Sequence, residues 1–230
     1  MAMRYEDILQ KLESLSNPEA VAGMARFGIR PARAFGVAMP ALRQLARQIG
    51  RDHQLAERLW DAGIRETRIL ATLVDDPRQV TDEQMERWAL EFDGWELCDQ
   101  CCMNLFERLP NAYAKCVEWS SRGEELVKRA AFVLMARLAV SDKKAQDDAF
   151  EDFFILIWRE SSDSRDLVKK AVNWALRQIG KRDIELNARA IATAQALQAL
   201  ESKSARWIAS DALRELTSPA VQARLHKRHV

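Results

Sequence analysis

A tryptophan and an aspartate stand four residues apart near the start of a predicted helix. Asp93-Gly94-Trp95-Glu96 has the form of a helix start, with Asp93 as N-cap and Glu96 in the capping-box position. Trp95 and Asp99 then share one face of that helix. The positive end of a helix favours the ionised carboxylate. An ionised carboxylate in such a place can stabilise a positive charge that develops during a reaction.

The same residues also fit a purely structural role. On that interpretation Trp95 anchors the core and Asp99 is a surface charge, since some of the 7 tryptophans must be core residues. Trp174 has the same two interpretations, but it belongs to a basic helix, which suits a nucleic-acid surface better than a core. The basic residues of that helix are Lys169, Lys170 and Arg177.

Helical periodicity runs along almost the whole chain, and alternating strand patterns are hard to find. The 8 glycines and 6 prolines fall mostly where helices should end. Residues 126–130 resemble residues 167–171, and residues 175–177 recur at 212–214, which are offsets of 41 and 37 residues. Such offsets are typical of HEAT or armadillo repeats.

We therefore predict an all-α fold, a HEAT-like or armadillo-type α-solenoid of stacked antiparallel helix pairs, with residues 1–230 as a single domain. The predicted pairs are 53–62 with 65–75, 81–92 with 95–108, 110–120 with 123–139, 145–159 with 163–180, and 184–200 with 203–216. A helical section near 4–14 and 37–49 is expected to cap the array.

The formal net charge is only +1, but charge is segregated along the chain. Residues 145–163 are acidic and residues 164–182 basic, while residues 26–51 hold six arginines and no acid. In a two-layer solenoid the second helices of the pairs share one surface, so we expect a basic concave face that follows a phosphate backbone. Solvated helices with mixed charge are the alternative.

All four cysteines, Cys98, Cys101, Cys102 and Cys116, fall in one short window. Cys98 and Cys101 form a C-x-x-C pattern, which suits a metal or redox site, but a βαβ context is absent and histidines are few. We therefore expect reduced, packed thiols, and neither a metal nor a cofactor. No apolar run is long enough for a membrane span or a signal core, which predicts a soluble, cytoplasmic protein without a membrane partner. We also expect it to be a monomer.

Three motifs occur in a fixed order, all on predicted second helices. They are Trp-x-x-x-Asp at 95–99, Arg-Ala-Ala at 129–131 and Trp-Ala-Leu-Arg at 174–177. Shorter matches include Gly-Val at 36–37 and Glu-Thr-Arg at 66–68. Over roughly residues 20–185 the chain resembles the DNA alkylation repair family of AlkD-like, HEAT-repeat DNA glycosylases of bacteria.

This resemblance implies a DNA glycosylase of base excision repair. Such an enzyme hydrolyses the N-glycosidic bond between the deoxyribose and a purine alkylated at N3 or N7. It implies that Asp99 is the catalytic carboxylate, that Trp95 and Trp174 pack against the lesion and its sugar, and that Arg129 engages the backbone nearby. The implied partner is double-stranded DNA with alkylated bases, in the cytoplasm at the nucleoid. The chain departs from the family at Phe27, where active members tend to have Tyr.

The residues expected to contact DNA combine the basic segments with this resemblance. They are Lys128, Lys169, Lys170, Arg177, Arg43, Arg47, Arg68 and Phe27. A non-catalytic module is the rival interpretation, because solenoids of this kind also bind DNA, including branched or damaged DNA, or proteins along one surface. The rival predicts that Asp99→Asn leaves function intact.

Overall fold

The computed structural model describes residues 3–229, and its regular secondary structure there is entirely helical, which confirms the all-α prediction. The chain divides into two compact units, residues 1–109 and 110–230. Within the described residues, no helix combines the length and hydrophobicity that crossing a membrane requires.

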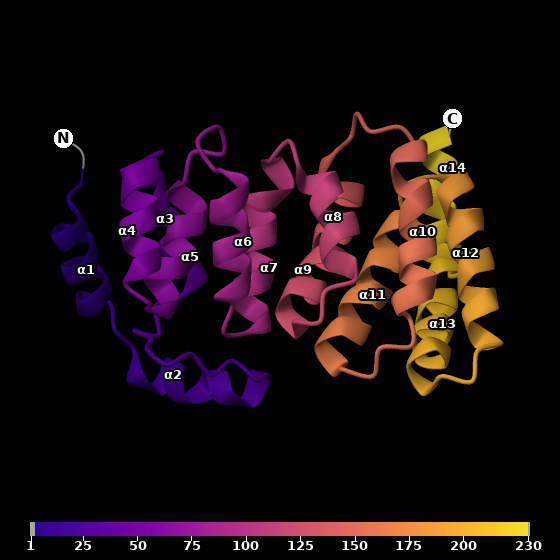
Figure 1. Cartoon of the computed structure of the whole chain (residues 1–230), viewed down its shortest axis with the longest axis horizontal. Coiled ribbons are helices and arrows are strands. Elements are labelled where there is room, and N and C mark those ends of the chain that lie inside the picture. Colours follow the sequence, from indigo (N-terminus) through magenta and orange to yellow (C-terminus); the bar gives the residue numbers. More distant parts are fainter. Residues whose placement is uncertain (1–2, 230) are drawn as a thin grey trace. The chain divides into compact units, whose positions relative to one another are not determined.

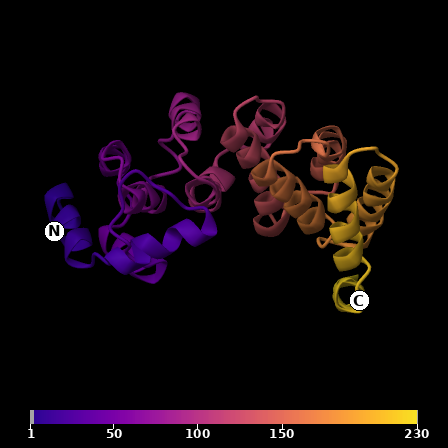
Figure 2. The ribbon, with the colours of Figure 1, turned by 90° about the horizontal axis from the view of Figure 1, so that it is seen from below.

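The first unit packs its helices around α5, which contacts α3, α4 and α7. Its helices are α1 (Tyr5–Ser14), α2 (Pro18–Met24), the 3₁₀ turn η1 (Ala25–Phe27), α3 (Met39–Ile49), α4 (His53–Asp61), α5 (Arg65–Val74), α6 (Asp82–Leu90), α7 (Trp95–Asn104) and the 3₁₀ turn η2 (Phe106–Arg108). The axes of most of these helices are roughly parallel, whereas α2 lies across their ends (Figures 1 and 2). This places η1 at the end where α7 begins.

The second unit has two layers. Its helices are α8 (Ala112–Ser120), α9 (Glu125–Ser141), α10 (Asp148–Glu160), α11 (Asp166–Ile179), α12 (Ile184–Gln198), α13 (Lys203–Leu216) and α14 (Pro219–His229). The second helices α9, α11 and α13 contact one another in that order, and α10 contacts both α8 and α12 in the other layer. This arrangement is the one expected of stacked helix pairs (Figure 1).

Capping residues and apolar stripes explain where the helices form. Asp52 accepts a hydrogen bond from the Leu55 amide at 2.9 Å at the start of α4, and Asp183 does the same for Leu186 at 2.8 Å at the start of α12. These bonds satisfy amides that lack a partner within the helix. The helices of all five predicted pairs are present, with ends shifted by a few residues, and α4 packs against α5, α8 against α9, α10 against α11 and α12 against α13.

Two helices were not predicted. α2 begins at Pro18, and Asn17 caps it by accepting from the Ala20 amide at 3.0 Å, so its start signal is present in the sequence. α14 has a weaker signal, because its buried apolar residues are only Val221 and Leu225, one turn apart. Helices this short owe their stability to tertiary packing rather than to intrinsic propensity.

The end of α11 shows how closely the second unit packs. Gly180 caps this helix, and a Cβ atom at this position would lie 2.6 Å from the Ala190 Cβ and 2.9 Å from the Leu216 Cδ2. Real carbon atoms do not approach so closely. The absence of a side chain therefore lets α11 pack directly against α12 and α13.

We expect Gly180→Ala to lower the free energy of unfolding by about 1–3 kcal/mol, because the added methyl forces two packed side chains apart. Urea denaturation of the purified protein measures this change. Gly23→Ala is the matched control, since nothing lies within 4 Å of a Cβ at this position in α2. Alanine in a helix is about 0.5–1 kcal/mol more favourable than glycine, so the control should be neutral or stabilising. A loss of stability in both variants would contradict this account of Gly180.

Candidate functional site

The start of α7 carries the tryptophan and the carboxylate singled out in the sequence. Trp95 is the first residue of α7, and Asp99 follows one turn later. Asp99 is only 8% exposed, whereas Trp95 is half-buried. Both residues interact further with other groups of the protein. The prediction of one shared helix is thus confirmed, but Asp99 is a buried carboxylate and not a surface charge.

Phe27 is tied to the same end of α7. The Trp95 Nε1 donates a hydrogen bond to the Phe27 carbonyl oxygen at 3.0 Å, across 68 residues of sequence. The Phe27 side chain itself is 72% exposed. Gly28 follows with a φ of +72°, a left-handed conformation that favours glycine and ends η1. The Phe27 backbone, the Trp95 indole and the buried Asp99 carboxylate therefore lie at the N-terminal end of α7.

The predicted cap of α7 is wrong. Gly94 is the N-cap and no side chain bonds there, so Asp93 does not cap the helix. Glu96 does not complete a capping box either, because its carboxylate accepts from the Arg65 Nε at 2.7 Å and from the Arg65 Nη2 at 2.5 Å. A charge-assisted bidentate pair is stronger than a bond to a backbone amide, so Arg65 determines where this carboxylate lies.

A buried ion network fixes the segment that follows η1. The Glu66 side chain is fully buried and accepts hydrogen bonds from the Phe35 amide at 2.7 Å and the Gly36 amide at 2.9 Å. The Arg65 Nη1 donates to Glu66 at 2.8 Å while the other guanidinium nitrogens bind Glu96. Segment 28–38, α5 and α7 are thus linked through two adjacent residues of α5. Sequence reasoning missed this network, although residues 66–68 belong to a motif quoted for the family resemblance.

Trp174 lies on α11 of the second unit and is half-buried. Its neighbour Asn173 donates to the Asp211 carboxylate at 2.7 Å, and Arg177 forms an ion pair with Glu215. Both partners belong to α13, so these polar contacts fix α11 against α13. The position of Trp174 is therefore held by neighbours on both sides along its own helix.

Arg129 and Lys128 have partners inside the second unit. Arg129 is 7% exposed, and its Nη1 donates to the Leu167 carbonyl at 2.7 Å, which joins α9 to the start of α11. The Lys128 Nζ lies 2.5 Å from a Glu160 carboxylate oxygen and 3.4 Å from one of Asp163. Arg129 and Trp174 thus lie on two helices in contact, α9 and α11, whereas Trp95 and Asp99 share α7 of the first unit.

Lys128 and its partners give stability a dependence on pH. Hydrogen bonds from the Arg165 side chain, together with the Lys128 charge, lower the pKa of Asp163 from 3.8 to about 2. Because the folded pKa is below the unfolded value, this stabilisation is present above about pH 4 and lost as the pH falls toward 2. We expect Asp163→Asn to be less stable than the wild type at pH 7, with a difference that shrinks between pH 4 and 2. Urea midpoints at several pH values measure it, and a constant difference would contradict the prediction.

The other basic residues fall into two classes. The Arg68 guanidinium donates to the Glu91 carbonyl at 3.1 Å, and Lys169 pairs with Asp166 at 2.6 Å, so both make contacts within the protein. Arg177 and Lys181 both form ion pairs with the Glu215 carboxylate. The basic segment 164–182 is therefore partly neutralised inside its own unit. The exposed cations of the predicted set are Arg43, Arg47 and Lys170.

The four cysteines are buried, which confirms that they are packed. Burial raises the pKa of the thiols of Cys101, Cys102 and Cys116. Within the described residues, one group of three carboxylates has donor atoms within 4.8 Å of one another, Asp147, Asp183 and Glu185. Burial and the like charge of Asp183 raise the pKa of Asp147. Acidic groups this close are common without an ion, so they assign no metal site.

The model of a family described as "DNA alkylation repair enzyme" matches residues 8–216, which is most of the chain. The protein belongs to this DNA alkylation repair family. A search of curated proteins finds no match.

Solved structures support the fold. The protein is similar to one described as "A new family of proteins related to the HEAT-like repeat DNA glycosylases with affinity for branched DNA structures", with 20% identity, a TM-score of 0.78 and coverage of 97% of this chain and 96% of the other. This likeness shows the HEAT-like repeat fold. A designed armadillo repeat protein, "YIII(Dq)4CqI", also matches with 16% identity, a TM-score of 0.37 and coverage of 77% and 92%, and the fold assignment does not depend on it.

Proposed function

We propose that this protein is a DNA glycosylase that excises purines alkylated at N3 or N7 from duplex DNA. The observation that carries the proposal is the group at the start of α7, where Asp99 is buried one turn from Trp95 and Trp95 holds the backbone of the exposed Phe27. Membership of the DNA alkylation repair family supports it.

The chemistry suits a carboxylate without a strong general acid. A purine alkylated at N3 or N7 is cationic and already a good leaving group, so it needs little protonation. As the glycosidic bond breaks, the deoxyribose becomes oxocarbenium-like. An ionised Asp99 beside the sugar would stabilise this charge and orient the attacking water, and it keeps its effect because it is shielded from solvent.

Aromatic side chains supply selectivity for the charged base. An indole or phenyl face attracts a cation by about 0.5–2 kcal/mol, and a neutral purine lacks this attraction. Trp95 and Phe27 offer such faces in the first unit, and Trp174 offers one in the second. A preference for cationic lesions thus requires no deep pocket around the base.

A non-catalytic role in DNA binding is the second candidate. The similar solved structure is described as having affinity for branched DNA, and the present chain has Phe27 where active family members tend to have Tyr. Without the hydroxyl of that tyrosine, the site at α7 has one polar group fewer to orient the sugar or water. Binding would then persist without base release.

Release of 7-methylguanine and 3-methyladenine from methylated duplex DNA tests the proposal directly. We expect the purified protein to release both bases with multiple turnovers. Binding to a four-way junction and to a linear duplex of equal length is measured in parallel. If the protein releases no base and binds the junction more tightly than the duplex, the glycosylase proposal is wrong and the non-catalytic DNA-binding role is supported.

A further inference from the structure

A cavity of about 360 Å³ in the first unit is lined by four arginines. Arg43 and Arg47 come from α3, Arg51 from the loop after it, and Arg108 from η2 at the end of α7. Asn104, the last residue of α7, adds an amide group, and no carboxylate lines the cavity. We call these four arginines the arginine cradle.

Arg51 is held in place by backbone oxygens. Its Nη1 donates to the Leu73 carbonyl at 3.1 Å and to the Asp75 carbonyl at 2.5 Å, at the end of α5. Burial and the positive charge of Arg108 lower the pKa of Arg51. The cradle therefore concentrates like charges that repel one another, and an anion bound between them would relieve this repulsion.

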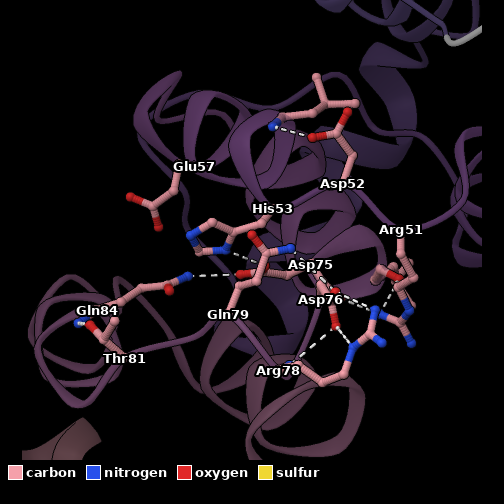
Figure 3. A network of polar contacts seen from close by, with 12 residues as sticks. Arg51, Asp52, His53, Glu57, Asp75, Asp76, Arg78, Gln79, Thr81 and Gln84 are labelled. Atoms are coloured by element: carbon pink, nitrogen blue, oxygen red, sulfur yellow. Dashed lines mark hydrogen bonds and ion pairs between the residues drawn. The ribbon is translucent and has the colours of Figure 1, made fainter.

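Nearby acids act on Arg51, because the charges of Asp76 and Asp75 raise its pKa and offset part of the lowering by burial and Arg108. Asp76 lies close to Arg51, but its carboxylate binds the Arg78 side chain through two hydrogen bonds of 3.0 and 2.8 Å (Figure 3). Among the described residues, Arg43, Arg47 and Arg108 have no carboxylate partner. Six other arginines of the same unit are ion-paired, namely Arg4, Arg58, Arg65, Arg68, Arg78 and Arg87.

The cradle is separate from the aromatic and carboxylate group. Asn104 ends α7 and Trp95 begins it, so nine helical steps separate them, about 14 Å at 1.5 Å per residue. A ligand in the cradle therefore does not occupy the place of the base or sugar at Trp95.

We propose that the arginine cradle binds one phosphodiester group of a DNA strand. Guanidinium groups match phosphate oxygens in a bidentate geometry, and several of them around one concavity define a single position for the anion. The inference rests on DNA being the partner in the proposed function, but it does not require base release.

The salt dependence of binding to undamaged duplex DNA tests the number of phosphate contacts. We expect the double variant Arg43→Gln, Arg47→Gln to bind DNA more weakly. The negative slope of the logarithm of the association constant against the logarithm of the salt concentration should become shallower by about 0.9, the value for one lost phosphate contact. The control is Arg4→Gln, Arg58→Gln, which removes the same charge from ion-paired, exposed arginines of the same unit. Equal changes in both double variants would overturn the cradle as a specific site.

Duplexes with a single methylphosphonate linkage test whether one phosphate is involved. In the wild type, one linkage position should weaken binding clearly more than the others, and in the Arg43→Gln, Arg47→Gln variant that position should lose its effect. A uniform effect of all positions overturns the proposal. Titration with inorganic phosphate is a separate experiment. If phosphate saturates the cradle but no linkage position in DNA has a specific effect, the cradle binds small phosphates and not DNA.

These measurements separate the two proposals. A protein that releases no base but shows the position-specific loss supports the cradle and refutes the glycosylase. A protein that releases alkylated bases without the position-specific loss supports the glycosylase and refutes the cradle.

Discussion

Replacing Asp99 by asparagine is expected to reduce the release of alkylated purines by at least about 100-fold, a typical cost of removing one group that stabilises transition-state charge. Asparagine has nearly the same shape, so the buried position at α7 can accept it, but the amide carries no negative charge to oppose the oxocarbenium-like sugar. Single-turnover release of 7-methylguanine measures the chemical step, and fluorescence anisotropy with the same duplex shows that binding is retained.

Asp93→Asn is the matched control, since Asp93 is 40% exposed and lies two residues before α7. Its carboxylate is 3.8 Å from the Arg68 guanidinium, which is beyond hydrogen-bond distance. We expect it to release bases at the wild-type rate. Unchanged release by Asp99→Asn would remove Asp99 from the reaction. An equal loss in both variants would show that general negative charge near α7, rather than one carboxylate, determines the rate.

Replacing Arg65 by methionine is expected to lower the free energy of unfolding by about 3–5 kcal/mol, the usual cost of removing one partner from a buried ion pair. The change leaves Glu66 and Glu96 without their shared cation, and Glu66 is fully buried. The segment that Glu66 holds through the Phe35 and Gly36 amides should loosen as well. Urea denaturation gives the stability, and amide hydrogen exchange at Phe35 and Gly36 reports the segment.

Arg58→Met provides the comparison, because Arg58 forms its ion pair with Glu6 and both side chains are exposed. Exposed pairs contribute little, so this variant should unfold close to the wild-type midpoint. If Arg65→Met has the same small effect, the network does not organise the start of α7. If stability falls but exchange at Gly36 is unchanged, Glu66 holds the segment without help from Arg65.

The helix pairs could be predicted from sequence because their signals are local. Apolar residues repeat every three to four positions, and capping residues such as Asp52 and Asp183 mark the starts. The pairing of Trp95 with Asp99 follows from spacing along one helix. Such information does not depend on distant parts of the chain.

The rest of the site depends on long-range contacts that leave no pattern. A carboxylate such as Glu66 that binds two amides 30 and 31 residues away looks like any other glutamate in sequence. The charge of Lys128 is visible, but its direction is not, and in the structure it points to Glu160 and Asp163. Basic character was therefore a poor guide to exposure on α9.

The burial of every cysteine has a consequence for survival under chemical stress. Thiolates are strong nucleophiles, and electrophiles that methylate purines also attack accessible thiolates. Cys101, Cys102 and Cys116 are fully buried, with pKa values raised by that burial, so they stay neutral and out of contact with solvent. A repair protein built this way resists inactivation by the reagents that create the damage it is proposed to remove.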